Sequence, residues 1–346
     1  MLLAFRVFDT YWFQQTIKLL AVLVVIPVGG LLLGWLFLLK MMAHMQSRLG
    51  LMEPGGYHGW FQNIGDAVKF IQKEDLIPKK ADKWVFSLAP YVVVLSTFLA
   101  FLVIPAGPDL VISNLSAGVF YTLAVSSIGV LGILMAGWAS ANKYSLIGSL
   151  RAAGQLIAYE LPMVLSVVGV VMQAGTMSLQ GIVQKQIDFK IFGLDVAGMP
   201  FIFTQFVGFI IFLIATQAEL SQAPFDMPVA ESELVTGYMT EYSGFRFLSF
   251  FLGEIASTFA LSAVAATLFL GGWYIPLPAW FHNNLANVTG PVVLLVKILF
   301  VSFLIFWIRF SYPRFREDQL QSIAWKYLIP ISLVNIMATA VFKVAF

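Results

Sequence analysis

Long apolar runs separated by short polar segments make up most of this chain. Each run has roughly 20 residues, the length at which a helix crosses about 30 Å of hydrocarbon at about 1.5 Å per residue. The pattern therefore predicts an all-α, polytopic membrane protein of eight transmembrane helices in one domain, residues 1–346. We place the spans at residues 17–39, 84–104, 117–139, 155–174, 200–217, 247–271, 290–310 and 327–345.

The first run is longer than the roughly 7 to 15 residues of a signal-peptide core, and no small-residue cleavage motif follows it. We therefore expect a retained helix. Fourteen of the 20 basic residues lie after spans one, three, five and seven or beside those segments, so this side should face inward and both termini outward. They are Lys40, Arg48, Lys69, Lys73, Lys79, Lys80, Lys83, Lys143, Arg151, Arg246, Arg309, Arg314, Arg316 and Lys326.

The first inward loop contains a helical pattern of its own. Apolar side chains recur at helical spacing from Trp60 to Ile71, with Asp66, Lys69 and Lys73 between them. This predicts an amphipathic helix lying in the membrane interface. It could simply anchor the loop, or it could also line a ligand entrance.

Composition narrows the function classes. Hydrophobic residues make up 60% and charged residues only 11%, against about 25% charged in soluble domains. Cysteine is absent, so the chain can hold no thiolate-bound iron–sulfur cluster, and a redox role requires partners. The isolated His44, His58 and His282 predict no metal site, and no nucleotide motif occurs. A net charge of +2 without a basic patch gives no sign of nucleic-acid binding.

One carboxylate stands in the fourth predicted span. Glu160 lies there with Pro162 two residues later. Burying a carboxylate at this depth costs several kcal/mol unless it is protonated or paired. Glu160 could reach the interface or pair with Arg151, but we favour an acid that carries a proton.

Glu254 in the sixth span and Lys297 in the seventh are the next ionisable groups at membrane depth. They could form a structural ion pair. Together with Glu160 they could instead form a chain of titratable groups, as a proton relay requires.

The segment 218–246 carries five of the 18 acidic residues and lies on the side expected to be basic: Glu219, Asp226, Glu231, Glu233 and Glu241. Pro224 and Pro228 end the preceding helix. A solvated acidic loop is one interpretation. The interleaved apolar residues favour a partly buried loop beneath a partner protein, where neighbouring carboxylates would have coupled, raised pKa values.

Many short motifs in this order resemble those of one family, the quinone-chamber membrane component of respiratory complex I, known in bacteria as the H-subunit. The likeness covers nearly the whole chain after about residue 45. The motifs include Met45-Gln46-Ser47-Arg48, Asp66-Ala67-Val68-Lys69, Gly137-Trp138-Ala139-Ser140, Leu150-Arg151-Ala152-Ala153, Tyr159-Glu160, Ala218-Glu219, Pro224-Phe225-Asp226, Thr240-Glu241-Tyr242-Ser243-Gly244 and Pro313-Arg314-Phe315-Arg316.

The resemblance implies a subunit where the electron-transfer arm meets the proton-pumping arm, with a quinone as substrate and no metal, flavin or iron–sulfur cluster of its own. It assigns the quinone chamber to Phe225, Asp226, Glu231, Glu233, Arg246 and Arg48. The expected proton route is Glu160, Glu219, Glu254 and Lys297. The inward face would meet the soluble arm through Arg314, Arg316 and Asp318.

Implied partners are the iron–sulfur and quinone-site subunits of the soluble arm, small membrane-arm subunits and membrane lipid, with no nucleic acid. The implied location is a bacterial plasma membrane, or alternatively an organelle inner membrane. Leu38, Gln222 and Val229 replace charged residues usual in the family, which makes the chamber less charged. Two other functions stay open: a stand-alone ion or solute transporter, and the equivalent subunit of a ferredoxin-linked or membrane-bound hydrogenase complex.

Overall fold

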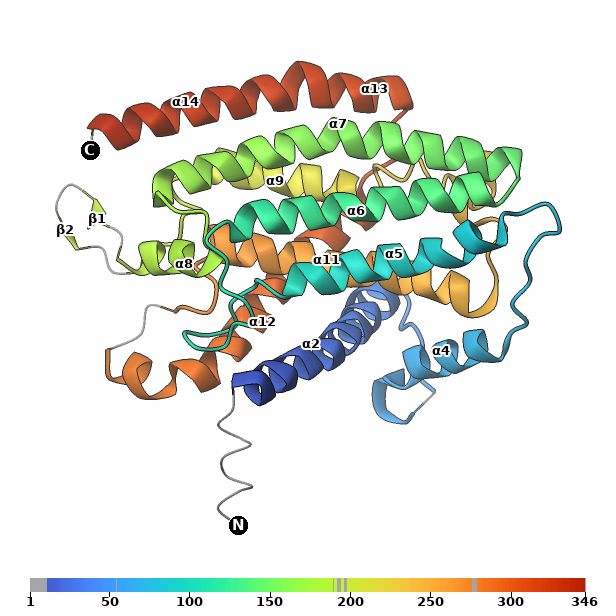
Figure 1. The fold of residues 1–346 in the computed structure, drawn as a ribbon, viewed down its shortest axis with the longest axis horizontal. Helices are drawn as coiled ribbons and strands as arrows, with labels where there is room; N and C mark the ends of the chain where they lie inside the picture. Colours follow the sequence, from blue (N-terminus) through green and yellow to red (C-terminus); the bar gives the residue numbers. More distant parts are fainter. Residues whose placement is uncertain are drawn as a thin grey trace, which may run out of the picture.

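The structure of the protein is a computed structural model. It describes residues 11–53, 55–188, 190–191, 194–195, 198–275 and 279–345, and only the backbone is described for residues 11–14, 57, 190–191, 194–195, 231–232 and 279–286. His282 and the Glu231 side chain therefore lie outside what is described. Figure 1 shows the long helices running side by side in one bundle.

Seven of the described helices are long and apolar enough to cross a membrane, which confirms the predicted class. The first span joins α2 (Tyr11–Leu33), the π-helix η1 (Gly34–Met41) and α3 (Met42–Met45). The next ones are α5 (Lys83–Phe101), α6 (Gly118–Ala139), α7 (Lys143–Ala174), α11 (Gly244–Phe269) and α12 (Ala279–Ser311). The last span joins α13 (Glu317–Ile323), the π-helix η4 (Ala324–Leu328) and α14 (Ile329–Ala345).

The predicted fifth span is the exception. It becomes α9 (Phe206–Glu219), with 14 residues, which is about 21 Å and too short to cross by itself. Residues 200–205 form turns instead, and they are bonded to other segments of the bundle. The Phe201 N–H donates to Gln186 Oε1 at 3.1 Å, and Asn335 Nδ2 donates to Gln205 Oε1 at 3.0 Å. Irregular backbone at membrane depth is tolerated where protein groups satisfy it in this way.

Four predicted boundaries were also wrong. The helix of the seventh span, α12, begins at Ala279 rather than 290. α7 begins at Lys143 rather than 155, capped by the Asn142 side chain, which accepts from the Tyr144 N–H at 2.9 Å. Its 32 residues span about 48 Å, so its first turns extend beyond the hydrocarbon. The first span continues to Met45 and the last begins at Glu317. Polar residues on these extensions hid them from a search for apolar runs.

Short elements complete the chain: η2 (Tyr57–Gly59), α4 (Gln62–Gln72), α8 (Leu179–Ile187), the antiparallel pair β1 (Lys190–Ile191) and β2 (Leu194–Asp195), α10 (Glu231–Leu234) and η3 (Gly237–Met239). Figure 1 shows α4 at one end of the bundle and α8 with β1–β2 at the other, toward which α2 begins and α14 ends. The first described helix therefore begins on the side of the bundle where the last one ends.

The predicted interfacial helix is α4. Its apolar Ile64, Val68 and Ile71 are exposed, whereas Asn63 Nδ2 donates to the Leu31 carbonyl of α2 at 2.8 Å. The helix thus docks on the bundle through Asn63 and through Phe70, which stacks on Phe247, and it offers Ile64, Val68 and Ile71 outward, as expected at a membrane surface.

The central helix is α11, which contacts α2, α4, α5, α8, α9 and α12. Small residues let its neighbours approach. A Cβ added to Gly29 of α2 would lie 2.8 Å from the Phe259 ring of α11, so a larger residue at this crossing would force the ring to move.

Candidate functional site

The loop between α9 and α11 is built into the inner end of the bundle. Gln155 Nε2 of α7 donates to the carbonyls of Ala218 and Phe225, both at 2.7 Å, and the Phe315 N–H donates to the Pro224 carbonyl at 3.1 Å. Phe225, Met227 and Leu234 are at most 5% exposed. The loop is therefore partly buried as predicted, and the solvated alternative was wrong.

A cavity of about 780 Å³ lies between this loop, α11 and α12. That volume falls within the about 300–1,000 Å³ of ligand sites. We call it the inner chamber. Its lining includes the ionisable Asp226, Glu254, Arg309 and Arg314, the polar Ser221, Gln222 and Thr236, and the apolar Val229, Met239, Phe247 and Phe251.

Two arginines hold the acidic side of the inner chamber. Arg314 Nε lies 3.2 Å from Asp226 Oδ1, and Arg314 Nη2 lies 3.5 Å from Glu233 Oε1. Arg151 Nη1 donates to Glu233 Oε2 at 2.7 Å and Arg151 Nε lies 3.8 Å from Glu317 Oε2. The hydrogen bond from Arg151, and then the charge of Arg314, hold the pKa of Glu233 below its usual value, so the raised pKa predicted for the loop carboxylates was wrong for this residue. The loop, α7 and α13 are thus joined electrostatically.

On the opposite wall, Arg309 Nη1 of α12 donates to Glu254 Oε1 of α11 at 2.9 Å. The proposed Glu254–Lys297 ion pair was therefore wrong. Lys297 Nζ instead donates to the carbonyls of Gly272 and Tyr274 at 2.8 and 2.5 Å. These groups lie past the C-terminal end of α11, about 27 Å along that helix from Glu254. The structure thus separates Lys297 from the other residues of the expected proton route.

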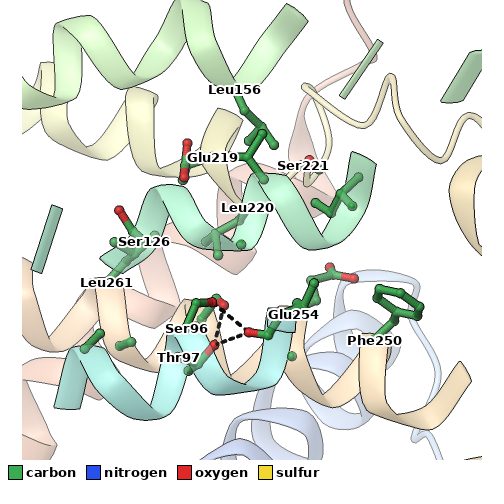
Figure 2. A pocket seen from close by; sticks show the side chains of 18 of the residues that line it. Ser96, Thr97, Ser126, Leu156, Glu219, Leu220, Ser221, Phe250, Glu254 and Leu261 are labelled. Carbon is green, nitrogen blue, oxygen red and sulfur yellow. Dashed lines mark hydrogen bonds between the residues drawn. The ribbon is translucent and has the colours of Figure 1, made fainter. Parts of the chain in front are cut away.

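A smaller cavity of about 90 Å³ lies deeper in the bundle, large enough for a few water molecules. Figure 2 shows Glu219, Ser221 and Glu254 around it with the hydroxyls of Ser96, Thr97 and Ser126. Thr97 Oγ1 and Ser257 Oγ are 2.9 Å apart at its edge. We call it the hydroxyl cavity. Ser221 and Glu254 line both this cavity and the inner chamber, so the two spaces adjoin.

The carboxyl group of Glu219 is buried, and its Oε2 atom has no hydrogen-bond partner among the described residues. Glu160 of α7 is close enough for its charge to act on Glu219, and it forms no ion pair within the described part of the chain. The alternative that Glu160 pairs with Arg151 was wrong, since Arg151 binds Glu233 and Glu317. Glu160, Glu219 and Glu254 therefore form a row of acids leading from the inner chamber into the bundle.

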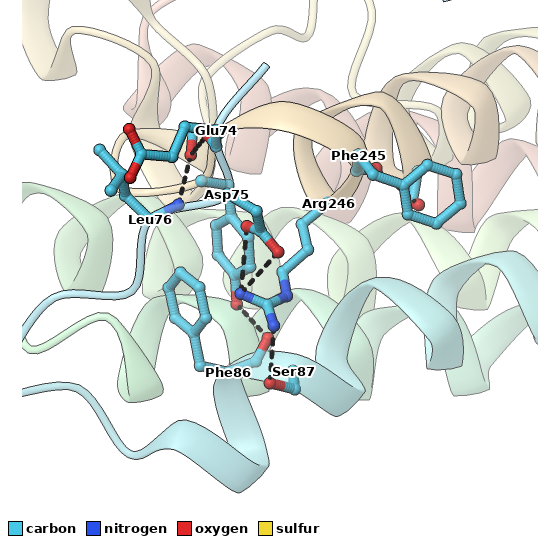
Figure 3. A network of polar contacts seen from close by, with 10 residues as sticks. Glu74, Asp75, Leu76, Phe86, Ser87, Phe245 and Arg246 are labelled. Carbon is cyan, nitrogen blue, oxygen red and sulfur yellow. Dashed lines mark hydrogen bonds and ion pairs between the residues drawn. The ribbon is translucent and has the colours of Figure 1, made fainter. Parts of the chain in front are cut away.

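Of the expected chamber residues whose side chains are described, only Asp226 lines the inner chamber, and Glu233 is linked to it only through Arg314. The other three lie elsewhere. Arg246 forms a separate network, seen in Figure 3, in which Nη1 lies 3.1 Å from Asp75 and Nη2 donates to Ser87 at 3.2 Å. Arg246 thereby ties the segment after α4 to the head of α11. Arg48 donates to Gln46 at 2.9 Å on the exposed surface. Phe225 packs on the Tyr159 and Phe315 rings in the core beneath the loop, rather than against the chamber.

The inward face also carries the expected contact residues for a soluble arm. Arg316 and Asp318 pair at 3.1 Å with side chains 80% and 66% exposed, while Arg314 is turned into the chamber. Within the described residues, no group of three or more histidine or acidic side chains could hold a metal ion.

Sequence reasoning missed Arg309 and Ser221 as site residues. Arg309 was counted only as an inward charge, since nothing in the sequence links it to Glu254, 55 positions away. Ser221 follows α9, has a positive φ of 51° and lines both cavities. Tyr238, which also lines the hydroxyl cavity, was missed because tyrosine is ordinary in an apolar loop.

Fold and site together define a multi-pass membrane protein whose inner end holds a charged chamber and a row of intramembrane acids. The family described as NADH dehydrogenase matches residues 17–340. The chain is 45% identical over 328 residues, 94% of each chain, to the NADH-quinone oxidoreductase H-subunit of Bacillus mycoides (strain KBAB4). It is 44% identical, at the same coverage, to the H-subunits of Bacillus thuringiensis subsp. konkukian (strain 97-27) and Bacillus anthracis (strain CDC 684 / NRRL 3495). The chain belongs to this family of NADH-quinone oxidoreductase H-subunits.

Proposed function

We propose that this chain is the quinone-binding, proton-coupling membrane subunit of a proton-translocating NADH:quinone oxidoreductase in a bacterial plasma membrane. One observation carries the proposal: the inner chamber adjoins the hydroxyl cavity through Ser221 and Glu254. A ligand whose charge changes in the chamber would act directly on groups that lead into the membrane.

The chemistry follows from charge compensation. Reduction of a quinone to the quinol takes up two electrons and two protons, so negative charge develops on the headgroup before the protons arrive. In this chamber, Arg309 and Arg314 would attract that charge and thereby weaken their hold on Glu254 and Asp226. Those carboxylates would then bind protons more readily. Glu219 and Glu160, held partly away from water, would pass the change inward.

A chain without cysteine would need partner proteins to supply the electrons. They would come from an iron–sulfur protein docked over the inward face, near the exposed Arg316–Asp318 pair. Other membrane-arm subunits would accept the coupled protonation change. The stand-alone transporter is not favoured, because the relatives that match 94% of the chain are named as oxidoreductase subunits. They do not favour the hydrogenase-type alternative either.

The test is Glu219→Gln in the assembled complex, reconstituted in vesicles. The change removes a titratable group from the hydroxyl cavity but keeps its size. We expect proton translocation per quinone reduced to fall severalfold while quinone reduction without a proton gradient persists. Glu53→Gln, at an exposed carboxylate outside both cavities, is the matched control. Normal translocation in Glu219→Gln would remove this residue from the route.

A second variant tests the chamber itself. Asp226→Asn should lower quinone reductase activity at least tenfold while the complex still assembles, since it removes one charge that faces the ligand. Wild-type turnover with normal quinone affinity would contradict the assignment of this cavity as the quinone site.

A further inference from the structure

A third cavity, of about 410 Å³, lies at the other end of the bundle. It is enclosed by the first half of α2, the segment after α5, α11 and the first half of α12. Its floor is buried: Phe259, Ala263, Leu294 and Ile298 are at most 5% exposed. Ala21 and Val25 of α2 are exposed at its rim. We call it the outer cavity.

The outer cavity is separate from the proposed quinone site. It shares no lining residue with the inner chamber or the hydroxyl cavity. Between them, the Phe259 ring packs against Gly29 so closely that an added Cβ would lie 2.8 Å from it, and it stacks on Phe101 at 5.3 Å. An occupant of the outer cavity would therefore not reach the inner chamber.

The lining determines what can fill this space. Except for Lys18, the residues around it are apolar, and a buried water molecule needs two to four polar partners. The neighbouring face of α2 is exposed and wholly aliphatic, including Leu20, Leu23, Val24 and Val28. That face meets hydrocarbon in a membrane, so a lipid chain can enter the cavity directly from the bilayer.

Lys18 is the only charged residue among the described residues that line the outer cavity. Its Nζ donates to the Asp109 and Val111 carbonyls at 3.2 and 3.0 Å, which uses two of its three N–H groups and neutralises none of its charge. The nearby Asp109 carboxylate accepts from Asn287 Nδ2 at 2.9 Å. A cation is therefore fixed at headgroup level directly above an apolar cavity, with one donor still available.

We propose that the outer cavity binds one acyl chain of an anionic phospholipid from the outward leaflet, whose phosphate group contacts Lys18. The cation favours a phospholipid over an uncharged quinone tail. The volume, within the range of small-molecule sites, suits a single chain. The bound lipid would fill the wedge between α2, α11 and α12 and stabilise the first span, whose lipid-facing side has few protein contacts of its own.

The test uses the assembled complex reconstituted with phosphatidylglycerol that carries a photoreactive diazirine on one acyl chain. Peptides labelled after irradiation are identified by mass spectrometry. We expect labels on peptides that contain Val22, Ile112 or Leu294. Ala21→Trp, which places a large ring in the cavity mouth, should reduce this labelling severalfold. Val24→Trp is the matched control, since Val24 is 62% exposed on the same helix but does not line the cavity.

The headgroup is tested separately with Lys18→Gln. Labelling by phosphatidylglycerol should fall about fivefold, the factor expected for one basic residue at an anionic surface. Labelling by a phosphatidylcholine probe, whose choline group offsets the charge of the phosphate, should fall by much less. Equal labelling in Ala21→Trp and Val24→Trp would overturn the proposal. So would an equal effect of Lys18→Gln on both lipids, or recovery of these positions cross-linked to a neighbouring subunit instead of lipid. None of these outcomes depends on the quinone site.

Discussion

Arg314 is the residue whose removal should loosen the inner chamber most clearly. Its guanidinium contacts both Asp226 and Glu233, and the Arg314 side chain is 24% exposed. The pair with Asp226, which is 37% exposed, lies between surface pairs worth about 0–1 kcal/mol and buried pairs whose disruption costs about 3–5 kcal/mol. We assign it about 1.5 kcal/mol. Glu233, 53% exposed at 3.5 Å, adds about 0.5 kcal/mol.

Arg314→Gln should therefore destabilise the loop by about 2 kcal/mol, which corresponds to an about 30-fold larger open fraction and equally faster amide exchange. Hydrogen exchange of the assembled complex measures this at amides that are bonded within the loop, such as Ala230 N–H to Asp226 O at 3.0 Å and Leu234 N–H to Ala230 O at 2.8 Å. Quinone reductase activity should fall in parallel, since the chamber wall is no longer held in place.

Arg316→Gln is the matched control for exchange. It removes the same group from a pair that is 80% and 66% exposed, so loop protection should change by less than about twofold. A double-mutant cycle with Asp226→Asn should give a coupling energy of about 1 kcal/mol or more. The reasoning is refuted if Arg314→Gln and Arg316→Gln leave the loop equally protected.

Three further predictions follow from other contacts. The pKa of Glu233 is lowered, so its ion pairs stabilise the loop fully above the unfolded-state pKa of about 4.3, and this stabilisation is lost as pH falls through the still lower pKa of the folded state. Protection of the loop amides should therefore hold from neutral pH to about pH 4.5 and decrease below it. Glu233→Gln should abolish this pH dependence. Gly237→Ala, at a φ of 59° with the new Cβ 1.8 Å from the Pro228 carbonyl, should cost more than about 2 kcal/mol and lower the melting temperature of the complex, whereas Gly65→Ala, with open space around it, should not. Arg246→Gln should release Asp75 and increase proteolysis after α4, with Lys73→Gln, which forms no ion pair among the described residues, as the control.

The α4 segment shows how structure extended a sequence prediction. The amphipathic pattern of residues 60–71 predicts an interfacial helix, and α4 confirms it. The pattern leaves open whether the helix only anchors the loop. In the structure Phe70 stacks at 5.5 Å on Phe247, which lines the inner chamber, and Arg246 holds Asp75. The helix therefore lies beside the chamber wall, a relation set by residues more than 150 positions apart.

For the acidic residues, the sequence identified the charged groups but not their ion-pair partners. Glu160, Glu219 and Glu254 stand out in the sequence because charge at membrane depth is costly. Their partners do not, since a helix crossing can bring together any two positions at the same depth. Arg309 rather than Lys297 binds Glu254, and Arg151 binds Glu233 rather than Glu160.

The sequence alone determined that this protein is a bundle of membrane helices and which side of it carries the basic loops. It also identified the acidic residues at membrane depth, whose burial costs enough free energy to indicate a function. These properties follow from local hydrophobicity and from the thickness of the bilayer, both of which can be read residue by residue. Only the tertiary structure decided which charges pair, that Phe225 supports the chamber from beneath, and that two cavities share Ser221 and Glu254. Pairing and cavities depend on how helices distant in the chain cross, and no local pattern specifies that.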